Sequence, residues 1–334
     1  MILLGAAAIA AETTVVLEGA VPDDGLDHFF LPFEVPPGTV ELEIRHDDLS
    51  DADILDWGLD GPDGGWRGWG GGTTAPAVLN ERAASPGYVP GPVTPGTWSV
   101  VGGEAKITTP PGAYRVEVVL RDAITLPPQD RRPFTDPGAL ASGARWYAGD
   151  VHVHSAESTD ADASLDAVAD LARERGLDWV VVTDHNTITG RDFLSAAQER
   201  HPDVLLIPGT ELTTYAGHAN AYGASAWVDH KIGQPGVTIE SAALAYAAQG
   251  AVLAINHPVL DLGDACIGCA WEHEIPPGAF AAIEIATGGW LPAGHLFTPP
   301  ARSAARSAAP RRWCGPTSSR SRPCSTASAP GAPW

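Results

Sequence analysis

The segment GDVHVHSAESTD, residues 149–160, places two histidines where both could bind the same ion. His152 and His154 alternate with valines, and residues two apart in a strand point to the same side. A single buried histidine is more often structural than a ligand, but two imidazoles on one side of a strand end need a stronger reason. The pair therefore predicts a strand that delivers two ligands to one divalent cation.

Later strand ends carry further imidazole and carboxylate groups. In chain order these are Asp184 with His185, Glu211 with His218 shortly after it, His257 and Glu284. Imidazole combined with carboxylate is the ligand mixture that suits Zn, Mn or Fe. We therefore expect a metal site built from several strand ends, and we interpret Glu284 as a structural carboxylate.

The elements that must position these groups follow from hydrophobic periodicity. From residue 146 onward, apolar strands such as LDWVVVTDHN alternate with helices such as SLDAVADLARERG, the stretch 191–200 and TIESAALAYAAQG. Such alternation predicts an α/β fold with a parallel sheet, whose functional groups gather at the carboxyl ends of the strands. Residues 13–123 instead alternate apolar and polar residues between Gly/Pro turns. They predict an all-β, sandwich-like domain, joined to the rest by a linker over 124–145.

The β region contains a glycine-rich stretch with three tryptophans, DWGLDGPDGGWRGWGGG. We expect it to be a loop in which Trp66 and Trp69 form an aromatic wall that contacts substrate or the second domain. The alternative is a loop that folds onto its own sheet by burying those rings. It lacks the Lys-Ser/Thr pair of a nucleotide-binding loop.

Five motifs together resemble a known superfamily. GDVHVHS, VVVTDHN, PGTELTT, GHANAYG and INHP are similar to the successive motifs of the PHP (polymerase and histidinol phosphatase) metal-dependent hydrolases. The preceding β domain, with ILDWGLDGP, GWRGWGGG and PGTELTTYAGHANAYG, resembles the CehA/McbA family within it. The resemblance covers roughly residues 13–290. It implies an incomplete (βα)7 barrel over 146–294.

The resemblance also implies roles for individual residues around two or three divalent ions, Mn, Zn or Fe. His152, His154 and Glu211 match the ligands of a first ion, and His185 with Asp160 those of a second, although Thr159 competes with Asp160 if one residue is inserted. Glu211, His218 and His257 match a third site, so Glu211 bridges. Asp184 is expected to orient a ligand rather than bind an ion. Glu211 and Asp184 are the catalytic candidates.

The implied reaction is hydrolysis by a metal-activated hydroxide, since divalent ions lower the pKa of bound water to near neutrality. The superfamily implies a small-molecule or short phosphoester substrate. The closer family implies an aryl carbamate or carboxylic ester. A rival of another class is a non-catalytic carbohydrate- or ligand-binding protein, or an inactive remnant, whose binding would resist chelators.

Charge and cysteine content restrict the partners. The chain of 334 residues has a formal net charge of −21, which argues against a stable nucleic-acid partner or an anionic membrane surface. It has no apolar stretch long enough to span a membrane, and oligomeric state cannot be inferred. Residues 1–12 fit either the remnant of an export signal or the lead-in to a first strand, so the protein is expected to be exported or cytoplasmic. Cys266 and Cys269 are expected to form a local disulfide or to remain as inert thiols.

The end of the chain departs from the PHP pattern. Such proteins finish with an Asp-x-His pair, but no acidic residue follows Glu284 here. Residues 295–334 are rich in Arg, Ser, Pro and Ala and lack hydrophobic periodicity. A basic disordered tail, a truncated relative and a frameshift are the three explanations, and composition favours the frameshift. The barrel is therefore expected to be incomplete at its carboxyl end.

Overall fold

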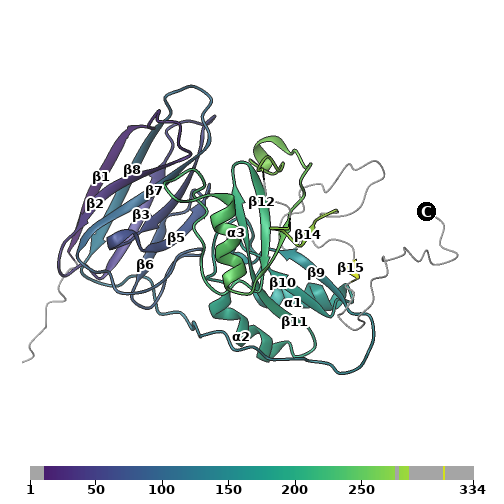
Figure 1. Cartoon of the computed structure of the whole chain (residues 1–334). Helices are drawn as coiled ribbons and strands as arrows, with labels where there is room; N and C mark the ends of the chain where they lie inside the picture. The colour runs from purple at the N-terminus through teal and green to yellow at the C-terminus, as the bar shows by residue number, and fades with distance from the viewer. Residues whose placement is uncertain (1–10, 275–277, 286–310, 313–334) are drawn as a thin grey trace, which may run out of the picture.

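Figure 1 shows the computed structural model of the protein, which describes residues 11–274, 278–285 and 311–312. The fold is mixed α/β with more strands than helices. Two antiparallel sheets form the N-terminal part, and a curled half-barrel sheet with three helices forms the C-terminal part. The expected signal remnant and most of the expected tail lie outside the described residues.

The N-terminal part consists of two four-stranded sheets with the orders β1-β8-β3-β6 and β2-β7-β4-β5. One hydrophobic core joins them, with Leu42 and Val118 from one sheet and Leu59 and Trp98 from the other all fully buried. The strands are β1 (Glu12–Ala20), β2 (His28–Val35), β3 (Glu41–Asp47), β4 (Ile54–Asp60), β5 (Trp66–Gly71), β6 (Ala77–Asn80), β7 (Gly96–Lys106) and β8 (Ala113–Arg121), with a short 3₁₀ turn η1 (Pro62–Gly64).

The glycine-rich stretch is a β-hairpin rather than the expected loop. β4 and β5 pair antiparallel across η1, and β4 lies inside its sheet beside β7. The glycines permit close packing: a Cβ on Gly58 would lie 2.5 Å from the ring of Trp69, and one on Gly68 would lie 2.4 Å from Tyr88. The loop prediction was therefore wrong because glycine in a strand also serves where a large ring packs directly on the backbone.

The C-terminal part is built around a seven-stranded sheet with the order β14-β13-β12-β11-β10-β9-β15. Helices α1 and α2 pack against β9–β11 through one apolar cluster, and α3 packs against β12 and β13 through another. The elements are β9 (Ala148–Val153), η2 (Ala156–Ser158), α1 (Leu165–Glu174), β10 (Trp179–Val182), α2 (Arg191–Arg200), β11 (Leu205–Thr214), β12 (Gly217–Tyr222), α3 (Ile239–Ala248), β13 (Val252–Ile255), η3 (Gly263–Ala265), β14 (Ala282–Ile283) and β15 (Arg311–Arg312).

The three helices begin and end where the sequence predicted. The side chain of Ser164 accepts a hydrogen bond from Ala167 N at the start of α1, and Gly176 has a φ of +71° just after its end. Thr238 and Ser241 form a reciprocal capping pair at the start of α3.

The expectation of a wholly parallel sheet was wrong at β12. Strands β9, β10 and β11 are parallel, but β12 pairs antiparallel with both β11 and β13. The turn at 215–216 is too short for a crossover helix, so the chain folds back as a hairpin. This reversal places His218 opposite Thr213, at the same edge of the sheet as the ends of the parallel strands.

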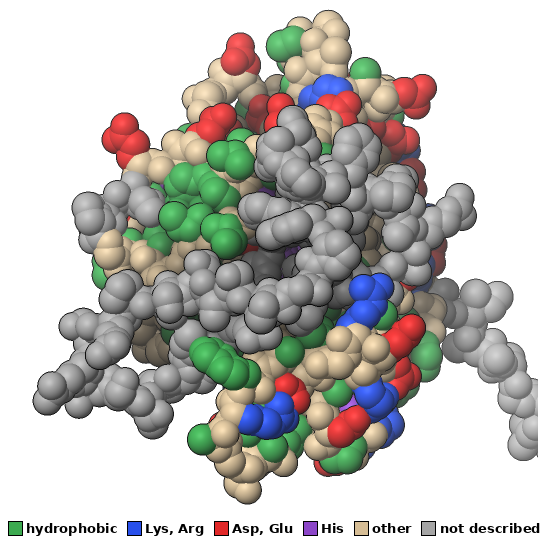
Figure 2. All heavy atoms as spheres, turned by 90° about the vertical axis from the view of Figure 1, so that its right-hand side faces the viewer, with side chains coloured by type: hydrophobic (Ala, Val, Ile, Leu, Met, Phe, Trp, Pro, Cys, Tyr) green, Lys and Arg blue, Asp and Glu red, His purple; other side chains and the backbone are tan. Residues whose placement is uncertain are grey.

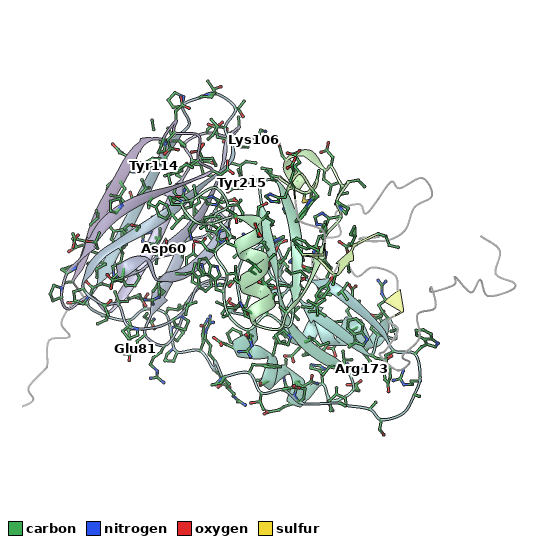
Figure 3. The ribbon with its side chains drawn as sticks, in the orientation of Figure 1. Asp60, Glu81, Lys106, Tyr114, Arg173 and Tyr215 are labelled. Atoms are coloured by element: carbon green, nitrogen blue, oxygen red, sulfur yellow. A yellow bond between two sulfur atoms is a disulfide. The ribbon has the colours of Figure 1, made fainter. Side chains whose placement is uncertain are left out.

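Three contacts between the two parts of the molecule come from the turn that joins β11 and β12, from the segment after β12 and from η3. The hydroxyl of Tyr215 donates to Asp56 Oδ2 on β4 over 2.8 Å, and Figure 3 shows Tyr215 between the two parts. Trp66 stacks on Trp227 with ring centroids 5.0 Å apart. Lys106, also labelled there, pairs with Asp264 at 2.7 Å. Both parts therefore meet beside the strand ends that carry the candidate ligands.

Within the described part of the chain, every helix falls short of the length and apolarity that a bilayer span requires.

A buried carboxylate ties the segment after β8 to the first sheet, and its removal should destabilise the fold. Glu41 is fully buried and accepts hydrogen bonds from Asn80 Nδ2 and from the backbone N–H groups of Thr125 and Leu126. We expect Glu41→Gln to lower the free energy of unfolding by about 3 kcal/mol, because the new amide presents N–H groups to donors that need an acceptor.

The measurement is urea unfolding with an unchanged m-value. The matched control is Glu18→Gln, which breaks an ion pair to Arg115 whose glutamate side chain is 65% exposed and should change stability by no more than about 0.5 kcal/mol. Equal effects of the two substitutions would contradict the assigned role of Glu41.

Candidate metal centre

The candidate ligands converge on one carboxylate. Glu211, on β11, is fully buried, and five imidazoles from the ends of β9, β10 and β13 and from β12 surround it. Glu211 Oε2 lies 3.1 Å from His152 Nε2, 3.3 Å from His154 Nε2 and 3.2 Å from His185 Nδ1, and Oε1 lies 3.4 Å from His218 Nδ1 and 3.6 Å from His257 Nε2. The two oxygens thus face two different sets of imidazoles.

Two overlapping groups in this cluster have ligand atoms within 4.8 Å of one another. One group is His154, His185 and Glu211, and the other is His152, Glu211 and His257. The structure also places Asp160 beside the first group, with Oδ2 3.4 Å from His185 Nε2. Thr159 is directed elsewhere, because its hydroxyl donates to Gly70 O. Of the two aligned candidates, Asp160 is the one that faces the cluster.

The pKa values in the cluster are set by burial and by the charges of Glu211, Asp160 and the imidazoles. Burial opposes ionisation of Glu211, but His152 and His185 hold its pKa well below the usual range. Burial would also lower the pKa of His185, yet Glu211 and Asp160 raise it to about 9. Burial dominates at His154 and lowers its pKa to about 4. Protons on some imidazoles therefore supply the counter-charge that divalent cations would supply instead.

The residues fit a divalent cation. His218 is 2% exposed, its Nε2 makes no hydrogen bond, and its Nδ1 has only Glu211 Oε1 at 3.4 Å. Buried polar atoms without a partner are costly and rare in native proteins, so such a ring needs another partner. A neutral imidazole nitrogen and a carboxylate oxygen are the donors that Zn, Mn and Fe accept. Glu211 with the surrounding histidines could hold more than one ion.

Several supporting residues escaped the sequence analysis. Asn256 is fully buried, and its Nδ2 donates to Glu211 Oε1 over 2.6 Å. The hydroxyl of Ser158 contacts His154 Nδ1 and accepts from His185 N. Asn256 was visible in the motif INHP, next to a candidate ligand, but its direction could not be inferred from the chain.

Glu284 also reaches the cluster. Its Oε2 lies 3.2 Å from His152 Nδ1 and accepts from His257 N, so it touches two candidate ligands from outside. Carboxylates that bind the second nitrogen of a metal-binding imidazole fix its ring orientation. The interpretation of Glu284 as a strand-end carboxylate was thus incomplete, because β14 lies beside β13 and brings it to His152.

A comparison with protein families matches the segment of the chain that carries this site. Residues 150–257 match the family model of the PHP domain. The matched segment begins at the strand of His152 and His154 and ends at His257. No curated protein matches the chain.

Two solved structures are similar to part of this chain. One is a two-domain protein from Bacteroides vulgatus that contains a predicted PHP-like metal-dependent phosphoesterase; it is 24% identical, with a TM-score of 0.31, over 47% of this chain and 48% of that chain. The other is an inferred metal-dependent phosphoesterase from Bifidobacterium adolescentis, 14% identical, with a TM-score of 0.30, over 41% of this chain and 76% of that chain. This chain spans about half the length of the first.

Asp184 lies behind the candidate ligands and not among them. Its carboxylate accepts from Ser155 N at 2.6 Å and from the Ser155 hydroxyl at 2.8 Å. Burial raises the pKa of Asp184 to about 7 against these hydrogen bonds. Asp184 therefore ties the residue after His154 to the residue before His185, which suits a positioning role.

The two tryptophans assigned to substrate occupy different places. Trp69 is 6% exposed and lines a cavity of about 960 Å³ between the N-terminal sheets and the PHP domain. Trp66 does not line that cavity and instead stacks on Trp227. His28 and His230, which the sequence analysis missed, lie beside Trp69 at the cavity wall. Burial lowers the pKa of His28 to about 4.

The cavity is acidic. His185 and His218 open into it, and seven aspartates line it, whereas no Lys or Arg is among its described lining residues. The seven are Asp47, Asp48, Asp51, Asp53, Asp56, Asp160 and Asp264. Figure 2 shows acidic side chains along the upper rim of one face of the molecule. A ligand that enters this cavity therefore meets aspartates and imidazoles, together with the apolar rings of Trp57 and Trp69.

A crowded glycine offers a test of the positioning role of Asp184. A Cβ on Gly190 would lie 2.5 Å from Asp184 Oδ2, although its backbone is ordinary helical conformation. We expect Gly190→Ala to displace the carboxylate from Ser155 and to weaken metal binding by about 10- to 100-fold, as for other residues that orient ligands.

Metal content after dialysis against a graded series of free Zn²⁺ or Mn²⁺ measures this change. Gly65→Ala is the control, because a Cβ there meets nothing closer than 3.6 Å. If Gly190→Ala bound metal as tightly as the control, Asp184 would have no part in positioning the ligands.

Proposed function

We propose that this protein is a metal-dependent hydrolase that cleaves a phosphoester. The observation that carries the proposal is the fully buried carboxylate of Glu211 within 3.6 Å of five imidazoles, beside a cavity of about 960 Å³. The match of residues 150–257 to the PHP domain supports it. We further propose that the site takes two or three divalent ions, Mn, Zn or Fe.

When bound, divalent cations act as Lewis acids and lower the pKa of water to near neutrality, so that no serine or cysteine nucleophile is required. The chain itself supplies the arrangement of ligands. Because its two oxygens face separate sets of imidazoles, Glu211 can serve two ion positions at once. The hydrogen bond from Asn256 Nδ2 to Oε1 fixes the rotation of the carboxylate, and Glu284 holds the ring of His152.

The cavity favours a substrate with an aromatic or neutral body over a polyanion. Trp57 and Trp69 lie in its wall and provide flat apolar surface. This observation also supports the second candidate, hydrolysis of an aryl carbamate or carboxylic ester as in the CehA/McbA family. The absence of Lys and Arg from the described lining supports a small-molecule substrate and no stable nucleic-acid partner.

The decisive experiment couples metal content with turnover. We expect the purified protein to hydrolyse at least one of p-nitrophenyl phosphate, an aryl phosphodiester or naphthyl N-methylcarbamate, and to lose that activity on chelation. Glu211→Gln should lower bound metal and turnover by at least about 100-fold, since it removes the charge shared by all five imidazoles.

Mass spectrometry of bound Mn, Fe and Zn on the same samples links the two readouts. Glu240→Gln, an exposed position on α3, is the control and should change neither. Turnover that resists chelation would overturn the proposal. Ligand binding without turnover or metal would favour the non-catalytic alternative.

The acidic cavity predicts selectivity by charge. Among aryl phosphodiesters with the same p-nitrophenyl group, the choline ester should be hydrolysed on the order of tenfold faster than a carboxylated ester of similar length, because aspartates attract the first and repel the second. Asp51→Asn, at an exposed part of the rim, should reduce the ratio of kcat/KM values, and added salt should reduce it further. A preference for the carboxylated ester would contradict this reading of the cavity.

A further inference from the structure

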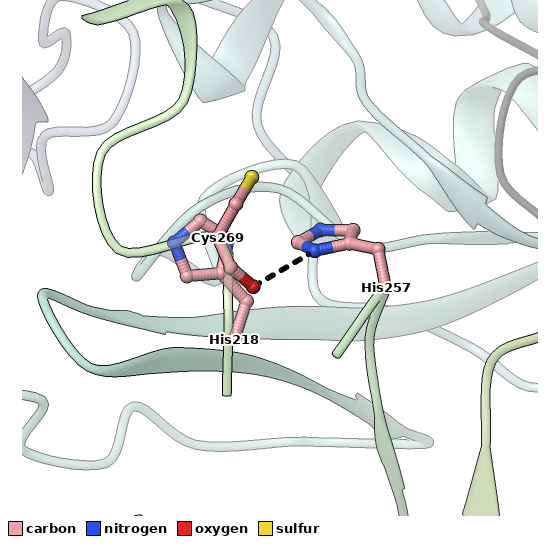
Figure 4. A group of neighbouring side chains, drawn as sticks. All are labelled: His218, His257 and Cys269. Carbon is pink, nitrogen blue, oxygen red and sulfur yellow. Dashed lines mark hydrogen bonds between the residues drawn. The ribbon is translucent and has the colours of Figure 1, made fainter. Parts of the chain in front are cut away.

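A cysteine lies beside the metal centre in a position to act as a ligand. Cys269, His218 and His257 offer ligand atoms that all lie within 4.8 Å of one another, and all three residues are buried (Figure 4). His218 Nε2 has no hydrogen-bond partner, and its Nδ1 lies 3.4 Å from Glu211 Oε1. The backbone carbonyl of Cys269 accepts a hydrogen bond from His257 Nδ1 over 3.2 Å. That bond places the proton of His257 on Nδ1 and leaves its Nε2 lone pair free toward Glu211.

The sulfur of Cys269 is held in a disulfide. Its partner is Cys266, three residues earlier, as the CIGC motif allowed. A thiolate is a strong ligand for soft and borderline cations such as Zn²⁺, whereas a disulfide sulfur has no negative charge to offer. The bond therefore withholds a soft ligand that lies within reach of His218 and His257.

The two sulfurs differ in access. Cys266 is half-buried and lines the cavity, while Cys269 is 2% exposed. A thiol that enters the cavity meets Cys266 first. Thiol–disulfide exchange at that sulfur would expel the other sulfur as a thiolate, and here the expelled sulfur is the one beside the histidines.

The loop around the disulfide is fixed on both sides, so breaking the bond should leave Cys269 in place. Gly268 has a φ of +71°, and a Cβ there would lie 2.4 Å from Thr214 O. Trp271 N donates to Pro258 O, and Glu272 N donates to Ala216 O. These contacts hold the chain after Cys269 against the β11–β12 turn and against the segment that follows β13, and they do not depend on the disulfide.

We propose that the Cys266–Cys269 disulfide is a redox gate on the metal centre, and that reduction releases Cys269 as a thiolate ligand that joins His218 and His257 on a thiophilic divalent cation. The proposal rests on the proposed metal site and adds its regulation. The site would bind Zn²⁺ more tightly in a reducing compartment than in an oxidising one, where such disulfides persist.

The reduction needs a dithiol as co-reactant. One thiolate of the dithiol attacks Cys266 Sγ, the Cys266–Cys269 bond breaks, and Cys269 leaves with the electron pair. The second thiolate of the dithiol then closes its own disulfide and releases Cys266. Two electrons and two protons pass from the dithiol to the protein, and Cys269 gives up its proton to solvent when it binds the ion.

Cobalt spectroscopy on the full chain tests the gate. Co²⁺ replaces Zn²⁺ in such sites, and a thiolate ligand adds a sulfur-to-cobalt charge-transfer band that imidazole and carboxylate ligands do not produce. We expect no such band in the oxidised protein and a band equivalent to one thiolate per chain after treatment with a dithiol that is then removed. Mass spectrometry reports total bound Co²⁺ in each sample.

Two matched variants separate the cysteines. Cys266→Ser breaks the disulfide but keeps Cys269, so it should show the band without any reductant and bind Zn²⁺ at least about tenfold more tightly than the oxidised protein. Cys269→Ser breaks the same disulfide and should show no band under any condition. If Cys266→Ser retained bound Co²⁺ but lacked the band, the redox-gate proposal would be overturned, whereas the proposed metal site would remain supported.

If none of the samples bound Co²⁺, the metal centre itself would fail, and the proposed function with it. A band of equal strength in Cys269→Ser would assign the sulfur to Cys266 and would also overturn the gate.

Discussion

The C-terminal half of this molecule depends on the burial of one carboxylate. Moving an ionised carboxylate out of water is expensive unless opposite charge and hydrogen bonds replace the solvent. Glu211 is fully buried, and its replacements for water are five imidazoles and the amide of Asn256. Every strand from β9 to β13 contributes to or adjoins that shell. The arrangement of strands in the sheet therefore determines which imidazoles surround Glu211.

Several candidate ligands could be grouped from the sequence because parallel strands have a simple geometric consequence. When β9, β10 and β11 run in the same direction, the residues that follow them must share one edge of the sheet. His152, His154, His185 and Glu211 could therefore be grouped from their places alone. His218 could not be grouped in this way, since only the fold-back of β12 brings it to this edge. The resemblance to PHP proteins implied its place in the site, which periodicity did not.

The other features of the site and cavity could not be predicted from the sequence, each for a physical reason. Glycine in DWGLDGPDGGWRGWGGG indicated a loop, but close ring packing on Gly58 and Gly68 requires the same residue in a strand. Asn256 and Glu284 each act through a side-chain contact, to Glu211 and to His152, and the spacing of residues along the chain does not predict where such side chains point. His28 and Trp69 join the cavity only because the N-terminal sheets pack beside the β11–β12 turn. Such long-range contacts depend on packing between separate segments of the chain.

The turn that joins β11 and β12 links these observations. It reverses the chain so that His218 faces Glu211, it carries Tyr215 to Asp56 on the N-terminal sheets, and it supports Gly268 in the disulfide loop. Asp56 is half-buried, and the desolvation of its carboxyl raises its pKa to about 6, so its bond to Tyr215 is formed at a cost that close packing must offset. His218 and the contacts of Asp56 and Gly268 thus all depend on this one turn. A shift of the turn would displace a candidate metal ligand, a carboxylate of the cavity wall and the disulfide loop together.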